Sequence, residues 1–260
     1  MILSDLHNHT YLCNHANGTV EEYVQMAISK GISIFGFSDH APMNFDTKYR
    51  MTFKQMQDYE SMVKDVATKY RDKIDIRLGY EVDYINGLVD KRVISRDVDY
   101  FIGSVHFVDK WGFDNPEFIG KYDEMDIDEL WKKYFDSISE MAQTKQFDIV
   151  GHFDLIKVFK YFPKTNITTL ASNALDAIAD SNMVIELNSA GLRKPVKEAY
   201  PSFSLLKEIQ KRHIPISFGS DAHEISQIGQ FTEQLLTFAK DAGFKSHVSF
   251  SNRKQEVLKF

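Results

Sequence analysis

The sequence has only one cysteine, Cys13, so no disulfide can form within the chain. A reducing compartment, the cytoplasm, is the simplest setting for this composition. No apolar run reaches the ~18 residues that a membrane-spanning helix needs, and the first residues lack the pattern of a secretory signal. The formal net charge of −6 offers no positive surface for nucleic acid or an acidic membrane. We therefore expect a cytoplasmic protein with no nucleic-acid or membrane partner; composition gives no indication of its oligomeric state.

Glycine-rich phosphate loops are also missing, which argues against a doubly wound dinucleotide-binding fold. Low-complexity segments, internal repeats and linkers are absent too. Short apolar segments instead alternate with amphipathic ones, a pattern that predicts βα units and a mainly parallel sheet. Seven or eight such units in 260 residues indicate one α/β domain, residues 1–260, built as an irregular closed TIM-like barrel.

The individual elements follow from periodicity and end signals. Thr19 and Thr52 each stand three residues before a Glu or Gln, the spacing of a capping box, and Pro201 is expected in the first turn of the last helix. The predicted helices are 19–30, 52–70, 126–142, 167–180 and 201–212. The predicted strands are 2–7, 32–38, 74–81, 98–106, 147–151, 183–188 and 214–220, with a possible last strand at 247–251.

The first predicted strand ends in His7-Asn8-His9. Residues two apart in a strand project from the same face, so His7 and His9 can point at one metal ion. Nine histidines in this length would produce roughly 0.3 such pairs by chance, so the pair alone is weak evidence for a metal site.

Other strand ends strengthen the metal hypothesis, because chemistry in a parallel barrel takes place at the carboxyl ends of the strands. His213 and His247 do not fit the pattern; we expect the first at a helix end and the second in solvent. Eight or nine ligands are too many for one ion, so we predict two or three divalent ions, with Glu81 able to bridge a pair. These ligand types suit Zn, Fe and Mn alike. Residues at or just past the predicted strand ends are His7, His9, His15, His40, Glu81, His106, His152, Asp221 and His223.

Two further expectations concern polar residues on the same strand faces. Asp5 shares a face with His7 and His9 and is a candidate partner for a ligand. Asp75 and Arg77 share a face with Glu81, and a buried arginine needs a partner, so we expect these two to pair near the barrel floor.

These residues resemble the motifs of the polymerase-and-histidinol-phosphatase (PHP) family of metal phosphoesterases. Within that family the chain looks most like the histidinol-phosphate phosphatases, on residues 103–107, 151–157 and 186–194. The segments that carry the family resemblance are Asp5-Leu6-His7-Asn8-His9, His15, Ser38-Asp39-His40, Gly79-Tyr80-Glu81, Ser104-Val105-His106, Gly151-His152 and Ser220-Asp221-Ala222-His223.

The resemblance implies a distorted (β/α)7 barrel with three divalent ions. It also implies that a hydroxide bridging two ions attacks the phosphorus of L-histidinol phosphate, without a phosphoenzyme, to give L-histidinol and phosphate in histidine biosynthesis. The implied ligand sets are His7, His9, Glu81 and Asp221 for the first ion, Glu81, His106 and His152 for the second, and His15, His40 and His223 for the third.

Charge suggests which residues contact the substrate. Arg193 follows the sixth predicted strand, and its planar guanidinium suits phosphate. Histidinol phosphate carries an ammonium and an imidazole, so we expect an acidic wall, with Glu117, Asp114 and Asp83 as candidates. The leaving alkoxide needs a proton, which Asp221 or a metal-bound water could supply.

Other chemistries fit less well. The residue six after Cys13 is Thr19, so a Cys-x5-Arg phosphatase is excluded, and Asp126-Ile-Asp128 opens a predicted helix instead of following a strand as an aspartyl-phosphate site would. Three alternatives stay open: a phosphatase for another small ester such as a nucleotide, a metal-dependent amidohydrolase, and a non-catalytic metal-binding module. No lysine is clearly placed at a strand end as a bridging carbamate, which disfavours the amidohydrolase.

Overall fold

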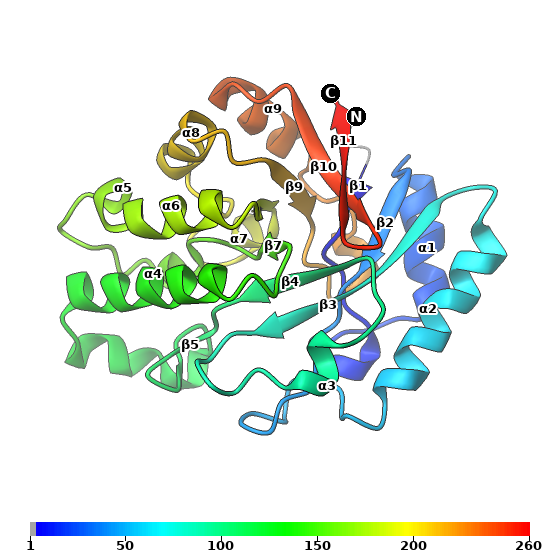
Figure 1. Ribbon diagram of the computed structural model, residues 1–260, viewed down its shortest axis with the longest axis horizontal. Coiled ribbons are helices and arrows are strands. Elements are labelled where there is room, and N and C mark those ends of the chain that lie inside the picture. Colours follow the sequence, from blue (N-terminus) through cyan, green and yellow to red (C-terminus); the bar gives the residue numbers. More distant parts are fainter. Residues whose placement is uncertain (1–3) are drawn as a thin grey trace.

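A computed structural model describes residues 4–260 of the chain (Figure 1). Seven strands form one sheet whose spatial order is the chain order, and every neighbouring pair is parallel. This arrangement confirms the single α/β domain with a parallel sheet. The strands are β1 (Ser4–Asp5), β2 (Ile34–Phe37), β3 (Asp75–Asp83), β4 (Tyr100–Ser104), β7 (Ile149–Val150), β8 (Val184–Asn188) and β9 (Ile216–Gly219).

The two edge strands, β1 and β9, meet and nearly close the sheet into a barrel. Leu6 donates its backbone N–H to the carbonyl of Phe218 at 2.9 Å, and just beyond the strands Asp221 donates to the carbonyl of His7 at 2.7 Å. The predicted closure is therefore confirmed, and it brings the first and last strand ends of the sheet side by side.

The helices surround the outside of the barrel (Figure 1). Thr19 and Glu22 form a complete capping box at α1, with each side chain accepting from the other residue's backbone N–H. The helices are α1 (Val20–Ser29), α2 (Met56–Tyr70), α3 (Lys91–Ile94), α4 (Ile127–Gln143), α5 (Ile167–Leu170), α6 (Ser172–Asp180), α7 (Ala190–Arg193), α8 (Phe203–Lys211) and α9 (Thr232–Ala242).

Three predicted helix starts or spans are wrong in detail. The Gln55 side chain accepts from the backbone N–H of Thr52, but residues 52–55 form a turn and α2 begins only at Met56. The predicted helix 167–180 is interrupted at Ala171 and forms α5 and α6. Pro201 precedes Ser202, the N-cap of α8, and so lies outside that helix.

A hairpin closes the amino-terminal end of the barrel, which we call the floor. The hairpin consists of β10 (Ser246–Ser251) and β11 (Lys254–Lys259), which pair antiparallel; β5 (Phe107–Val108) and β6 (Trp111–Gly112) form a second small hairpin. The predicted last strand therefore pairs outside the main sheet. Its Val248 and Phe250 pack against a buried cluster that includes Leu6, Tyr100 and Ile102.

Two polar groups near the floor complete the fold. Arg77 pairs with Asp75 at 2.6 Å, as expected, and also with Glu256 of β11 at 2.9 Å. His247, which we expected in solvent, is 1% exposed and stacks on Phe260, so that expectation is wrong.

Among residues 4–260 no helix combines the length and apolar character that crossing a membrane requires.

Candidate metal centre and active site

The carboxyl ends of the strands bring seven predicted histidines into one cluster at the mouth of the barrel. His9 and His223 stack with ring centroids 4.0 Å apart, and His9 lies 4.4 Å from His40. On the other side of the cluster, the rings of His106 and His152 are 4.8 Å apart. A cavity of about 820 Å³ opens over these rings.

Glu81, at the carboxyl end of β3, lies at the centre of the cluster and is 1% exposed. Ser104 donates its hydroxyl to Oε1 at 2.7 Å. The carboxylate faces five histidine rings, so it is placed to share its charge among several cations. The distances are 2.9 Å from Oε2 to His40 Nδ1, 3.4 Å to His7 Nε2 and 3.6 Å to His9 Nε2, and from Oε1 2.9 Å to His152 Nε2 and 3.7 Å to His106 Nε2.

Asp221 reaches the same cluster from the segment after β9. Its Oδ1 lies 3.2 Å from His9 Nε2 and 3.9 Å from His7 Nε2. The backbone of Asp221 has a positive φ of 50°, which turns the chain sharply at this point. The aspartate therefore adds a second carboxylate beside the His7 and His9 rings.

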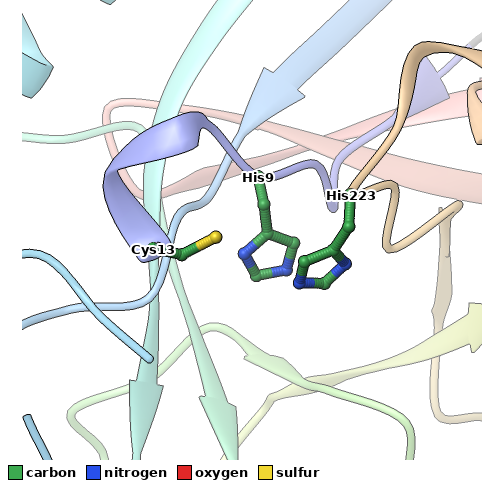
Figure 2. Close-up of side chains that lie close together, drawn as sticks. All are labelled: His9, Cys13 and His223. Carbon is green, nitrogen blue, oxygen red and sulfur yellow. The ribbon is translucent and has the colours of Figure 1, made fainter. Parts of the chain in front are cut away.

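Ligand-type atoms gather in several groups. Within each group these atoms lie within 4.8 Å of one another, and Figure 2 shows one group, in which the Cys13 sulfur points toward the ring of His9 with His223 on the far side. The cysteine was not a predicted ligand. The groups are His7, His9 and Glu81; Glu81, His106 and His152; His15, His40 and His223; and His9, Cys13 and His223.

The residues of the cluster fit divalent cations. The Nε2 atoms of His7, His9 and His223 are buried and have no hydrogen-bond partner within residues 4–260. A buried polar atom without a partner costs free energy, so such atoms need an explanation. Imidazole nitrogens and carboxylate oxygens are the donors that Zn, Fe and Mn accept.

Electrostatics at the mouth favour bound cations as well. Burial raises the pKa of Glu81, but the rings of His40 and His7 outweigh it and hold the pKa well below its usual range. Burial likewise lowers the pKa of His7, while Glu186, Glu81 and Asp221 together raise it well above normal. Because protons and metal ions compete for the same nitrogen atoms, a site that attracts protons in this way also attracts metal ions.

Carboxylates behind the cluster fix the orientation of the rings. His7 Nδ1 lies 2.7 Å from Glu186 Oε1, and His9 Nδ1 lies 3.4 Å from Asp39 Oδ1. Such outer partners orient ligand histidines and raise their basicity. We did not predict either contact, although a glutamate inside the apolar strand β8 was a usable signal. A Cβ at Gly219 would lie 1.9 Å from Glu186 Oε1, so only glycine allows this approach.

Asp5 has a different role from the one expected. Its carboxylate accepts hydrogen bonds from the backbone N–H and hydroxyl of Ser220 and from the side chain of Asn8. It therefore fixes the turn just before Asp221. Among residues 4–260 it forms no hydrogen bond or ion pair with a ligand-type histidine ring, which corrects our expectation.

Asp83, a candidate for the acidic substrate wall, is also placed elsewhere. Its Oδ2 pairs with Arg50 Nη1 at 2.5 Å and its Oδ1 lies 2.6 Å from His106 Nδ1. Burial raises the pKa of Asp83, but Arg50 and His106 hold it well below the usual range. Both oxygens are occupied and the residue does not line the cavity, so Asp83 orients His106 instead of facing a ligand.

The remaining substrate candidates do line the cavity. Arg193, at the end of α7, donates from Nη2 to the carbonyls of Ser220 at 2.6 Å and Asp221 at 3.0 Å. Burial lowers the pKa of its guanidinium. Asp114 and Glu117 lie in the segment after β6 on the cavity wall. Arginine and two carboxylates thus share one opening with the histidine cluster.

Known proteins resemble this chain along its whole length. A protein named "Probable histidinol-phosphatase" from Deinococcus radiodurans is 38% identical over 98% of this chain and 98% of that protein. A protein named "Histidinol-phosphatase" from Bacillus subtilis is 31% identical over 89% of this chain and 97% of that protein.

A solved structure has the same fold. It is histidinol phosphate phosphatase from Lactococcus lactis, in complex with Zn, L-histidinol and phosphate. The two chains superpose with a TM-score of 0.79 over 97% of this chain and 98% of that one, at 21% sequence identity. Residues 5–190 also match the family described as PHP domain, and this segment carries seven of the nine ligand-type residues at the barrel mouth. The relatives of 38% and 31% identity extend past the other two, Asp221 and His223. The chain therefore belongs to the PHP domain family.

Proposed function

We propose that this chain is a metal-dependent phosphatase that hydrolyses L-histidinol phosphate to L-histidinol and phosphate. One observation carries the proposal: buried Glu81 faces five histidine rings at the base of a large cavity. The curated relatives from Deinococcus and Bacillus, both named for this activity, support the choice of substrate. The free thiol of Cys13 supports a cytoplasmic location.

Three divalent ions are proposed, each of them Zn, Fe or Mn. When bound, such ions provide a water-derived nucleophile near neutral pH and neutralise the charge of a phosphoryl group. The proximity of the ligand-type atoms supports these assignments. The proposed sets are His7, His9, Glu81 and Asp221; Glu81, His106 and His152; and His15, His40 and His223.

The chain's other residues would bind and orient the ester. Arg193 is the proposed phosphate ligand, because its guanidinium lines the cavity beside Asp221. Asp221, which its histidine neighbours hold ionised, would take up the proton that the attacking water loses and pass it to the leaving oxygen. Asp114 and Glu117 would face the ammonium and imidazole of a histidinol group.

A phosphate-release screen of the purified, metal-loaded chain tests the proposed function. The substrates are histidinol phosphate, nucleoside monophosphates and sugar phosphates. We expect histidinol phosphate to exceed every other ester by at least about tenfold in kcat/KM, which corresponds to about 1.4 kcal/mol of transition-state preference. If a nucleotide or sugar phosphate has an equal kcat/KM, the proposed substrate is wrong, but the chain is still a phosphatase. If no ester releases phosphate, the proposal that the chain is a phosphatase is wrong.

A further inference from the structure

A buried tyrosine on the cavity wall has a hydroxyl without a hydrogen-bond partner in the described part of the chain. Tyr200 is 0% exposed as a residue, yet it lines the cavity together with Arg193, His152 and Asp221. Its hydroxyl has no hydrogen-bond partner among residues 4–260. Buried polar atoms are satisfied in most proteins, so this hydroxyl requires an explanation.

The backbone and ring of Tyr200 are held firmly on three sides. Its N–H and C=O both pair with Asn188 at the end of β8, at 3.0 and 2.7 Å. The ammonium of buried Lys157 lies 5.4 Å from the ring centroid. A Cβ at Gly191 would lie 3.0 Å from the ring atoms Cε2 and Cζ, so glycine leaves the room that the ring occupies. The ring therefore has a fixed position on the cavity wall.

That position is next to the residues proposed for phosphate. The ring of Tyr200 lies edge to face with His152, centroids 6.4 Å apart, and His152 is a proposed ligand of the second ion. Tyr200 and Arg193 also line the same cavity. A tyrosine hydroxyl keeps its proton near neutral pH, so the Tyr200 hydroxyl can act as a donor.

We propose that the Tyr200 hydroxyl donates a hydrogen bond to a phosphoryl oxygen of the substrate, beside the guanidinium of Arg193. The inference rests on the proposed function in one respect, namely that the ligand is a phosphate ester. A rigid donor of this kind binds the anion without the entropy that ordering a long side chain costs. Tyr200 is thus assigned to substrate binding, whereas Lys157 and Gly191 position it.

The test compares Tyr200→Phe with Tyr23→Phe. Tyr23 provides a matched control, because it is 1% exposed and its hydroxyl also lacks a hydrogen-bond partner within the described residues, but it does not line the cavity. The measurements on the metal-loaded full chain are the calorimetric Kd of inorganic phosphate, kcat/KM for histidinol phosphate, metal content and Tm.

For Tyr200→Phe we expect phosphate affinity and kcat/KM to fall roughly 10- to 100-fold, the range for a lost hydrogen bond to a charged group. Metal content should stay the same and Tm should not fall, because no protein partner is lost. Tyr23→Phe should match the wild type in every measurement. Phosphate affinity of Tyr200→Phe within twofold of wild type would overturn the proposal, as would equal losses in both variants or a loss of metal that accounts for the change. If wild type binds phosphate but leaves histidinol phosphate intact, the proposed function fails while the phosphate measurements still decide the role of Tyr200.

Discussion

Buried histidines at the two ends of the barrel have pKa shifts in opposite directions. At the mouth, burial lowers the pKa of His9 and His106, but the carboxylates around them raise it to about 9 and about 10. At the floor, His247 packs against Phe218 and Phe260, and neither ring nitrogen has a hydrogen-bond partner among the residues that the structure describes. Burial alone lowers its pKa to about 4. Partnerless imidazole nitrogens occur at both ends, so they do not by themselves indicate a metal site.

The histidines at the mouth lie so close together that the pKa values of some of them are lowered instead of raised. Burial and the nearby His9 ring lower the pKa of His223 well below normal, and burial lowers that of His40 to about 4 despite the charge of Glu81. The carboxylates can therefore support a positive charge on some rings only. Divalent ions, each shared by several neutral rings and a carboxylate, suit this arrangement better than one proton per ring.

Removing the central carboxylate should have the largest effect. Glu81→Gln keeps the shape of the side chain but takes away the charge that five histidines face. We expect metal content to fall and kcat/KM to drop by more than about 100-fold, the upper end for residues that merely orient a ligand. Elemental analysis and phosphate release measure the two effects. Full metal content with a normal rate would remove Glu81 from the metal centre.

The next largest effect is expected at Arg193. Arg193→Ala should lower kcat/KM roughly 10- to 100-fold through the lost contact to phosphate, with the metals retained. Exposed Arg92, which forms an ion pair with Asp90 and lies over the ring of Phe53, provides a control whose alanine variant should keep the wild-type kcat/KM. An unaltered kcat/KM in Arg193→Ala would remove that residue from the site.

A variant of Glu186 tests whether the carboxylate beside His7 strengthens metal binding. Glu186→Gln breaks the carboxylate contact to His7 Nδ1, so metal affinity should fall about 10- to 100-fold. Titration with a competing chelator gives the affinity, and Glu208→Gln on the surface of α8 is the control. Affinity equal to wild type would show that His7 needs no carboxylate behind it.

The smallest catalytic effect is expected at the floor, where His247→Phe should leave turnover unchanged at neutral pH. The unfolded chain binds a proton at this residue below pH 6.5, whereas the folded chain does so only near pH 4. Wild-type stability should therefore decrease as pH falls from 6.5 to 4, by up to about 3 kcal/mol from this residue. Urea unfolding at several pH values should show a smaller decrease in the variant; identical decreases would mean that His247 is not buried as a neutral ring.

Much of the mouth could be predicted from the sequence, because strand ends in a parallel barrel converge whatever the loops do. Period-two alternation along β3 was enough to predict that Glu81 faces the mouth, and the order of the apolar segments along the chain predicted the order of the strands. The contacts of Glu186 and Asp39 were not predictable in the same way, since they depend on how side chains from different strand ends pack against one another.

The misplaced residues depend on loops and on the last hairpin. Asp83 turns away from the cavity because Arg50, from an irregular loop, pairs with it, and no periodicity predicts that contact. His247 is buried because β11 folds back on β10, and the polar, mostly exposed sequence of β11 gave no strand signal. Local patterns could not determine either placement.

Metal content of His9→Ala is the most direct test of the central claim that the mouth histidines hold divalent ions. His213→Ala, at the end of α8, is the matched histidine control outside the cluster. Purified in parallel and analysed for metal per chain, His9→Ala should have lost bound metal while His213→Ala matches the wild type. Wild-type metal content in His9→Ala would contradict the account.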